Sequence, residues 1–213
     1  MPRIRFASVE PWDLGEGFFT LFENPRLMPH MHLPIQSGSD TVLRRMSRRC
    51  HTSEFTSLVT QARSEFPEFN ITTDVIVGFP GETDAEWQQT VDFVEAVKFG
   101  HIHRFSYSPR TGTKAAGMPD QIDDNTKKSR SRELHAMAHD HKLQFMQSQL
   151  NQNANVLWEG NSSNHPGMRF GYTENYTRVA LQHDDPLENC VTPCRLESLD
   201  EQGQFIRASL PQR

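Results

Sequence analysis

Cysteine is scarce in this chain of 213 residues, which contains only Cys50, Cys190 and Cys194. Three thiols do not suggest a disulfide scaffold. Long apolar stretches are also missing, because no run approaches the roughly 18 residues of a membrane span. The first residues lack the apolar segment of a signal peptide. We therefore expect no membrane association and a cytoplasmic location.

A surplus of positive charge is absent as well. The chain carries 27 acidic and 22 basic residues, for a formal net charge of −5, which argues against a dedicated nucleic-acid binder. Basic residues still gather in two clusters, at positions 44–49 and 127–132. Each cluster could contact phosphates or could be the solvated face of a helix.

Strand and helix patterns alternate through residue 107, as is typical of a parallel sheet built from βαβ units. The predicted strands cover residues 3–9, 31–35, 71–77 and 102–107. The predicted helices cover residues 14–22, 40–46, 54–66, 84–99 and 123–150, with Ser39 or Asp40 capping the second and Thr52 or Ser53 the third. Four βα units make half of a barrel or a small open sheet, because a complete eight-unit barrel needs about 250 residues.

Residues 71–83 are the most informative stretch. A β-branched, apolar strand that suits burial on both faces carries one acid, Asp74, and ends at Gly78-Phe79-Pro80-Gly81. Ligands of α/β folds bind where such strands end. The alternative is a tight strand-to-helix turn with a capping acid.

A different pattern begins near residue 150. Short strand candidates at 153–159, 168–172, 177–181, 189–198 and 204–210 predict a small all-β, OB-like barrel. We therefore divide the chain into residues 1–149 and 150–213. Such barrels often bind single-stranded RNA through aromatic and polar side chains. The candidates here are Phe170, Tyr172, Tyr176 and Arg178, which could equally be core and rim residues of the barrel.

Three blocks of sequence resemble the radical-SAM methylthiotransferases, in the order and spacing of that family. They begin at His32-Leu33-Pro34-Ile35-Gln36-Ser37-Gly38, at Asp74-Val75-Ile76-Val77-Gly78-Phe79-Pro80 and at Tyr107-Ser108-Pro109-Arg110-Thr111-Gly112-Thr113. The β-region resembles the RNA-binding TRAM barrel of the family. The run Gly171-Tyr172-Thr173-Glu174-Asn175-Tyr176 is most similar to the subgroup that acts on threonylcarbamoyladenosine in tRNA. The resemblance extends over nearly the whole chain.

The resemblance implies an α/β fold: the C-terminal half of a radical-SAM (βα) barrel followed by a TRAM barrel. It implies methylthiolation of threonylcarbamoyladenosine next to the anticodon of tRNA, with S-adenosylmethionine as cofactor and the tRNA anticodon region as partner. The implied cofactor-binding residues are Ser8, Glu10, Gln36, Ser37, Asp74, Val77, Phe79 and Gly81. The implied RNA-binding residues are Arg110, Tyr172, Tyr176 and Arg178.

The chain departs from the family in its cysteines. The family binds a four-iron cluster through a C-x3-C-x2-C motif and carries a second cluster on an N-terminal domain, and this chain has neither motif. Cys190 and Cys194 have the C-x3-C spacing but lie in the β-region, and a cluster usually needs four ligands. We therefore expect a chain that begins in mid-barrel, is inactive alone and has the missing N-terminal half as a possible partner.

Two alternatives remain at this stage. The chain could be a non-catalytic fragment that retains only tRNA binding. It also contains two H-x-H pairs, His30/His32 and His101/His103, each on a predicted strand and each pointing to one face. Paired histidines on barrel strands can bind zinc for hydrolysis, so a zinc-dependent hydrolase is the second alternative.

Overall fold

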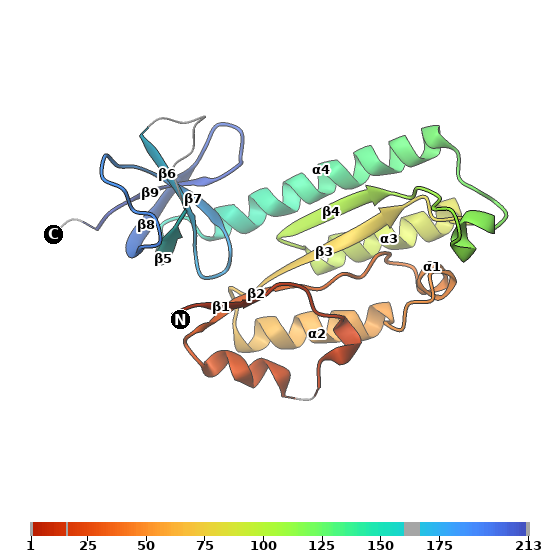
Figure 1. The fold of residues 1–213 in the computed structure, drawn as a ribbon, viewed down its shortest axis with the longest axis horizontal. Helices are drawn as coiled ribbons and strands as arrows, with labels where there is room; N and C mark the ends of the chain where they lie inside the picture. Colours follow the sequence, from red (N-terminus) through yellow and green to blue (C-terminus); the bar gives the residue numbers. More distant parts are fainter. Residues whose placement is uncertain (1, 16, 160–166, 212–213) are drawn as a thin grey trace.

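The structure, a computed structural model, describes residues 2–15, 17–159 and 167–211. Figure 1 shows a helix-covered sheet and a separate barrel, connected by a long helix. The α/β class and the closed five-stranded barrel predicted from the sequence are thereby confirmed. The order of the elements follows the alternation in the sequence, with the barrel after the helix.

The sheet has four strands in the order β1-β2-β3-β4, and all neighbours run parallel. The strands are β1 (Ile4–Phe6), β2 (Leu27–His32), β3 (Asn70–Val77) and β4 (His101–Ser106). The predicted second strand, 31–35, was placed too late. The residues after His32 continue alongside β3 without regular pairing, through Leu33 N–H to Thr72 O (2.9 Å) and a bridge between Gln36 and Val75.

The two faces of the sheet differ. Ile71, Val75 and Val77 are completely buried against the helices. On the opposite face of β3, Asp74 and Ile76 are only partly buried. The prediction of a strand buried on both faces was therefore wrong for the second half of β3, because no helix covers that side within the described residues. This open face carries the polar groups described below.

Four α-helices accompany the sheet: α1 (Asp40–Arg45), α2 (Thr52–Glu65), α3 (Asp84–Val97) and α4 (Asp124–Ser148). The predicted helix at 14–22 is absent, and two short 3-10 helices, Pro11–Asp13 and Phe18–Glu23, take its place. Gly17 adopts a left-handed φ of 70°, which interrupts an α-helix. Phe19 and Phe22 nevertheless reach the core beside Phe69.

Helix caps explain several boundaries. Thr83 and Glu86 form a reciprocal capping box at α3, with Glu86 N–H to Thr83 Oγ1 at 3.2 Å and Thr83 N–H to Glu86 Oε2 at 2.9 Å. Ser39 stands at the N-cap of α1 but makes no side-chain cap. Asp40 instead accepts a hydrogen bond from Thr52 N–H at the start of α2 (2.8 Å). Ser39 therefore has the predicted N-cap position without the predicted side-chain bond, and the N-cap of α2 is His51, whose N–H donates to Glu54 Oε2 (3.1 Å), in place of Thr52 or Ser53.

About half of the residues in the basic clusters form ion pairs. Arg45 binds Glu86 and Arg48 binds Glu10, each through two nitrogens. In the second cluster, the guanidinium of Arg130 is buried and ion-paired. Because bidentate carboxylates occupy these arginines, they stabilise the fold and are not free for phosphate.

The barrel closes in the order β5-β6-β7-β9-β8. Its strands are β5 (Asn153–Trp158), β6 (Met168–Tyr172), β7 (Arg178–Gln182), β8 (Val191–Leu199) and β9 (Ile206–Ser209). Val156, Trp158, Val179 and Leu196 fill its interior together with Cys194. Apolar residues alternate along the strands, and the alternation puts one side of each strand in the core.

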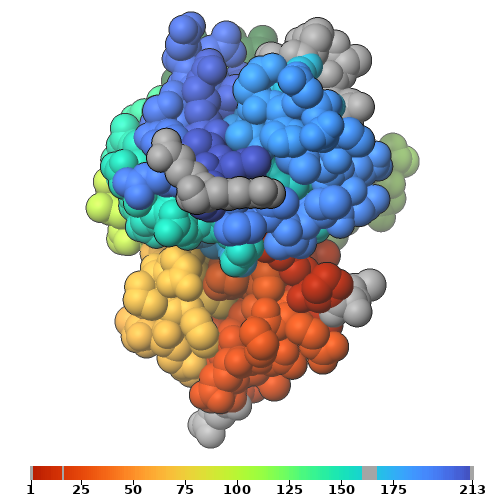
Figure 2. Space-filling model, turned by 90° about the vertical axis from the view of Figure 1, so that its left-hand side faces the viewer, coloured from red at the N-terminus to blue at the C-terminus, as the bar shows by residue number. Residues whose placement is uncertain are grey.

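The barrel is hydrogen-bonded to the sheet unit. Asn70 Nδ2 donates to Asn175 O (2.9 Å), and Asn175 Nδ2 donates to Gln149 Oε1 at the end of α4 (2.7 Å). Arg3 Nη2 donates to Asn155 O of β5 (2.8 Å). Figure 2 shows the barrel, in blue, stacked against the N-terminal third of the chain, in red to orange. The contact positions one side of the barrel over the amino-terminal end of β3 and β4.

Candidate functional site

A cavity of about 490 Å³ lies at the carboxyl ends of β3 and β4. We call it the carboxyl-edge cavity. It is lined by Gln36, Ile76, Phe105, Ser106, Tyr107, Ser108, Arg110, Thr113 and Ala115. This is the edge of a parallel sheet at which α/β proteins bind ligands.

Gln36 enters this cavity from a constrained backbone. Its φ is 79°, in the left-handed region that side chains other than glycine rarely adopt. Its N–H donates to Asp74 O and its carbonyl accepts from Ile76 N–H, both at 2.9 Å. The extension of the sheet therefore holds Gln36 in a conformation that costs of order 1–3 kcal/mol, and such strain clusters at functional sites.

Tyr107 offers an unsatisfied polar group beside Gln36. Its hydroxyl is buried and has no hydrogen-bond partner within the described residues, and its ring packs against Phe79 at 5.3 Å between centroids. Gly81 completes the turn with a φ of 74° and donates its N–H to Asp120 O (2.9 Å). Buried polar groups are normally paired, so a ligand with a polar atom fits this wall.

Other residues of the predicted cofactor set lie elsewhere. Ser37 is completely buried, with its hydroxyl 3.2 Å from that of Thr90. Val77 is completely buried in the core between sheet and helices. Glu10 is paired with Arg48, and Ser8 is exposed after β1. The structure thus brings Gln36, Phe79, Gly81 and Arg110 to the same edge of the sheet. It places Ser8, Glu10, Ser37 and Val77 away from the cavity wall.

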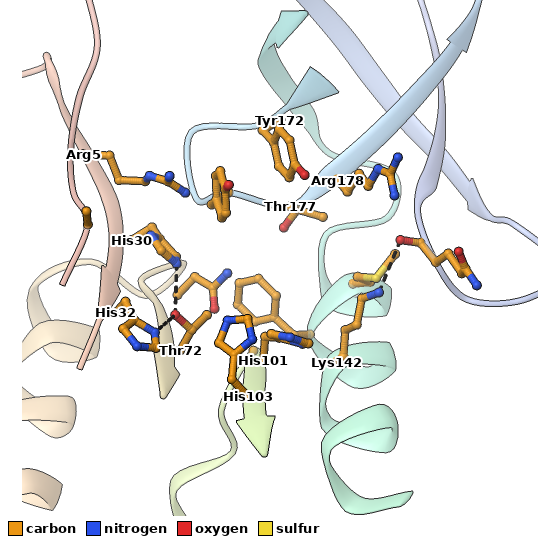
Figure 3. A pocket seen from close by; sticks show the side chains of 17 residues that line it. Arg5, His30, His32, Thr72, His101, His103, Lys142, Tyr172, Thr177 and Arg178 are labelled. Atoms are coloured by element: carbon orange, nitrogen blue, oxygen red, sulfur yellow. Dashed lines mark hydrogen bonds between the residues drawn. The ribbon is translucent and has the colours of Figure 1, made fainter. Parts of the chain in front are cut away.

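A second cavity, of about 560 Å³, lies between the sheet and the barrel. We call it the inter-unit cavity, and Figure 3 shows its side chains. Those labelled there are Arg5, His30, His32, Thr72, His101, His103, Lys142, Tyr172, Thr177 and Arg178. The sheet forms the floor, α4 one side and the barrel the roof.

The two H-x-H pairs meet on this floor. Thr72 Oγ1 lies 3.1 Å from His32 Nδ1 and 3.3 Å from His30 Nε2. The rings of His32 and His103 are 5.6 Å apart, and those of His101 and His103 are 4.5 Å apart. No group of three or more His, Cys, Asp or Glu side chains in the described parts of the chain is arranged to hold a metal ion.

Asp74, from the predicted cofactor set, belongs to this histidine group. Its Oδ1 lies 3.3 Å from His32 Nε2. It stands on the open face of the sheet, with a quarter of its side chain exposed. Asp74 therefore orients His32 in the structure, away from the wall of the carboxyl-edge cavity.

Desolvation keeps two of the histidines neutral, although only His30 is buried and His101 retains exposed surface. It lowers the pKa of His30 to about 3, with further lowering by the charge of Arg5 and by the neighbouring His32. It lowers the pKa of His101 to about 4, with His103 and Lys142 acting in the same direction. Both imidazoles are therefore neutral at pH 7 and can donate one hydrogen bond and accept another.

The depressed pKa of His30 predicts acid sensitivity. An unfolded histidine has a pKa near 6.5, so between pH 6.5 and 3 the unfolded chain binds a proton that the folded chain does not. Stability is therefore lost as the pH falls through this window. From pH 6.5 to 5 the loss is about 2 kcal/mol, at 1.36 kcal/mol per unit. Urea denaturation should show this extra loss in the wild type relative to His30→Gln, and parallel curves would contradict it.

Aromatic and cationic side chains form the roof. The rings of Tyr172 and Tyr176 stack at 4.3 Å with an angle of 12° between their planes. The guanidinium of Arg5 lies 3.4 Å from the centre of the Tyr176 ring, and that of Arg178 lies 4.7 Å from the centre of the Phe170 ring. The structure thus brings Tyr172, Tyr176 and Arg178 together, whereas Arg110 lies at the carboxyl-edge cavity.

Sequence reasoning missed Arg5 and Lys142. Arg5 lies on a short strand with weak alternation, and Lys142 is one of many polar residues along α4. Neither carries a motif. Only the docking of the barrel brings them to the same cavity, so the sequence contained no local signal for them.

Comparison with known proteins supports the resemblance seen in the sequence. Residues 15–94 match the model of the Radical SAM superfamily. The chain is 41% identical over 202 residues to the threonylcarbamoyladenosine tRNA methylthiotransferase MtaB of Thermotoga maritima, covering 94% of this chain and 46% of that protein. It is 33% identical to the protein of the same name from Bacillus subtilis, covering 96% and 47%. It is 38% identical to the tRNA-2-methylthio-N(6)-dimethylallyladenosine synthase of Bacillus pumilus, covering 81% and 34%.

A solved structure shows a related fold. Coproporphyrinogen III oxidase from Escherichia coli, a radical SAM enzyme, aligns with a TM-score of 0.56 at 13% identity, over 81% of this chain and 46% of that one. At this identity the likeness concerns the fold alone. The chain spans about half the length, or less, of the curated relatives it matches. The predicted family is confirmed by these similarities.

The cysteines of this chain do not fit an iron–sulfur cluster, which needs four ligands. Cys50 is buried beside the sheet, Cys194 is buried in the barrel and Cys190 is exposed. Burial raises the pKa of Cys50 to about 11, which disfavours the thiolate that would bind iron. By contrast, the wall formed by Gln36 and Tyr107 fits an organic cofactor with polar groups.

Proposed function

We propose, on the premise that this chain belongs to the radical SAM tRNA methylthiotransferase family, that it supplies part of an enzyme that methylthiolates threonylcarbamoyladenosine next to the anticodon of tRNA. In this proposal the sheet provides one wall of the S-adenosylmethionine site and the barrel provides an RNA-binding surface. The observation that carries the proposal is the pairing of a carboxyl-edge cavity with a basic, aromatic cavity under the barrel. A cytoplasmic location is part of the proposal.

The carboxyl-edge cavity would hold the cofactor through this chain's own polar groups. The amide of Gln36 and the unpartnered hydroxyl of Tyr107 can bind ribose or carboxylate oxygens. Gly81 lets the backbone of the turn approach closely. When bound, S-adenosylmethionine supplies the methyl group and the radical chemistry, while the protein orients it and limits access of water.

The barrel is proposed as a TRAM-like RNA-binding module. Stacked tyrosines beside arginines form the kind of surface on which unpaired bases stack. Tyr172, Tyr176 and Arg178 provide this combination on the side of the barrel that faces the sheet. The tRNA would therefore lie across both units, with its anticodon region as the part contacted.

Arg110 supports the choice of the threonylcarbamoyl substrate. A threonylcarbamoyl group carries a carboxylate, whereas a dimethylallyl group is apolar and uncharged. Arg110 is exposed and is the one charged side chain that lines the carboxyl-edge cavity in the described structure. An arginine paired with a carboxylate forms charge-assisted hydrogen bonds, so this cavity favours the threonylcarbamoyl group.

The proposal predicts a preference among modified RNAs. Three anticodon stem-loops of identical sequence would carry threonylcarbamoyladenosine, dimethylallyladenosine or adenosine at the target position. We expect the first to bind most tightly, by about tenfold over the others, because one charge-assisted hydrogen bond contributes about 1.5–3 kcal/mol. Fluorescence anisotropy measures the three affinities.

A matched pair of variants locates the source of this preference. Arg110→Ala should remove it, whereas Arg26→Ala, which removes an exposed arginine away from the cavity, should leave it intact. Tighter binding of the dimethylallyl stem-loop would assign the chain to the other subgroup of relatives. Equal affinity for all three stem-loops would favour the second candidate function, which is described next.

The second candidate is a non-catalytic tRNA-binding chain. The observation that favours it is the cysteine arrangement, because the three thiols lie apart and two of them are buried. In this case tRNA binds through the barrel without discrimination at the target nucleotide. Addition of a separately expressed chain that corresponds to the N-terminal half of the relatives would distinguish the two candidates, because only the first predicts that methylthiolation then occurs.

A further inference from the structure

We propose that the inter-unit cavity binds a single unstacked nucleotide, with its phosphate on the side of Lys142 and Arg178 and its base on the polar floor of β3. Ligand sites in proteins commonly have volumes of 300–1,000 Å³, and this cavity of about 560 Å³ falls in that range. The site is formed by the sheet, α4 and the barrel together, and is distinct from the carboxyl-edge cavity.

Charge is the first argument. Arg5, Lys142 and Arg178 line the cavity, and no Asp or Glu does so within the described residues. None of the three cations forms an ion pair in the part of the chain that the structure describes. A concave site with one sign of charge concentrates ions of the opposite sign. This concentration of cations contrasts with the net charge of −5 of the whole chain.

The position of the cations favours a phosphate. Lys142 and Arg178 approach the cavity from the same side, α4 below and β7 above (Figure 3). Lys142 Nζ donates to Gln204 O at 3.3 Å, and burial, together with the charge of Arg178, lowers the pKa of Lys142. A phosphate on this side of the cavity could accept charge-assisted hydrogen bonds from both side chains.

Unpartnered polar groups favour a base. Asn70 and His30 are 5% and 3% exposed, and Asn70 Oδ1 and His30 Nδ1 are buried without a hydrogen-bond partner among the described residues. Such groups are costly unless a ligand or water satisfies them. Asn70 Oδ1 faces Gly100, so the groups that can read the edge of a base are the imidazoles of His30 and His101 and the hydroxyl of Thr72, which line the cavity.

Neutral histidines and stacked rings complete the site. Because desolvation keeps His30 and His101 uncharged, they can bind a base without adding further positive charge at pH 7. Tyr172 and Tyr176 form the aromatic roof. A nucleotide has both the anion and the polar ring that this combination requires, whereas free phosphate would use only one side of the cavity.

This inference rests on the proposed function for the source of the nucleotide, which we take to be an unpaired residue of the tRNA. A free mononucleotide has the same chemistry, so the experiment separates the two sources. Isothermal titration of the full chain would use adenosine monophosphate, adenosine and inorganic phosphate as probes. We expect adenosine monophosphate to bind at least tenfold more tightly than either of the other two.

Two charge-removing variants test the location. Lys142→Gln and Arg178→Gln should each weaken binding of adenosine monophosphate about tenfold. Lys128→Gln removes one positive charge from an exposed position of α4, outside the cavity. It should change the affinity for adenosine monophosphate less than twofold. Circular dichroism confirms that each variant is folded. Equal binding of the nucleotide by wild type and by folded Lys142→Gln and Arg178→Gln proteins would overturn the inference.

Competition with RNA separates this inference from the proposed function. If the anticodon stem-loop displaces adenosine monophosphate and is itself weakened by Lys142→Gln, the cavity holds an RNA nucleotide. If the stem-loop binds without displacing adenosine monophosphate, and Lys142→Gln does not change the affinity for the stem-loop, the inference is wrong while the proposed function stands. If the mononucleotide binds through Lys142 and no stem-loop binds, the proposed function fails and the cavity is a mononucleotide site.

Discussion

Replacement of Arg130 by methionine should lower the free energy of unfolding by about 3–5 kcal/mol, the range for breaking a buried ion pair. Arg130 Nη1 lies 2.8 Å from Glu82 Oε2 and 3.1 Å from Glu82 O, and Glu82 has no exposed side-chain surface. Methionine retains the aliphatic packing but leaves the buried Glu82 carboxylate with Gly78 N–H, at 2.9 Å, as its one remaining hydrogen-bond donor among the described residues. The cost arises from that uncompensated charge.

Urea denaturation measures this loss, and two further variants identify its cause. Asp84→Asn removes the second partner of Arg130, but Asp84 is 97% exposed, so this change should cost less than about 1 kcal/mol. The double variant Arg130→Met/Glu82→Gln should recover most of the lost stability because it removes the orphaned charge. A loss in Arg130→Met as small as that in Asp84→Asn would contradict the account.

The pH dependence of the Arg130→Met penalty gives an independent check. Burial already raises the pKa of Glu82, while Arg130 lowers it. Removal of Arg130 therefore raises this pKa further. A raised pKa means that protonation stabilises the folded state, so the penalty should shrink as the pH falls from 8 towards 5.

The second large effect concerns activity. We expect the 213-residue chain, reconstituted with iron and sulfide, to retain no four-iron cluster and to methylthiolate no tRNA by itself. Its three cysteines cannot provide four ligands, and Cys50 and Cys194 are buried in different cores. Iron and sulfide analysis after desalting measures the content of cluster. Four irons per chain would refute this expectation.

Cysteine variants serve as controls for that experiment. Cys190 is exposed and Cys194 is buried, so any loosely bound iron should depend on Cys190 alone. Cys190→Ser should therefore remove residual iron, whereas Cys50→Ala should not change it. A spectrum that depends on all three cysteines would indicate a shared cluster and would contradict the separation of the two cores.

The local features of the fold could be predicted from the sequence. β3, the turn at Gly78–Gly81 and α3 follow from β-branched residues, paired glycines and the capping pair Thr83 and Glu86, all of which act within a few residues. The barrel strands follow from alternation between turn residues. Such features depend on interactions between residues that are close in the sequence, so they can be predicted from a single sequence.

Features that depend on competing local signals were harder to predict. Apolar residues at helical spacing favoured a helix at 14–22. Gly15 and Gly17 lie in the first turn of that predicted helix, and the structure has a 3-10 helix that begins after Gly17. The second strand was misplaced because Leu33 and Ile35 remain completely buried after regular pairing has ended at His32. Burial and hydrogen bonding therefore give different ends to that strand.

The inter-unit cavity could not be predicted because it arises from docking. The H-x-H pairs were visible in the sequence, but their assembly around Thr72 depends on the register of β2, β3 and β4. Lys142 approaches them because α4 packs against β4, whereas Arg178 approaches them because the barrel docks on the sheet unit, where Asn175 bonds both Asn70 and Gln149. Long-range contacts of this kind leave no local pattern.

The central proposal is that this chain contributes the RNA-binding part of a tRNA methylthiotransferase that acts on threonylcarbamoyladenosine. Its most direct test is the affinity of the wild-type chain for the anticodon stem-loop that carries threonylcarbamoyladenosine, beside the same stem-loop with adenosine. The account predicts binding of both, about tenfold tighter for the modified RNA and without that difference in Arg110→Ala. Failure of the chain to bind either stem-loop at low salt would contradict the account.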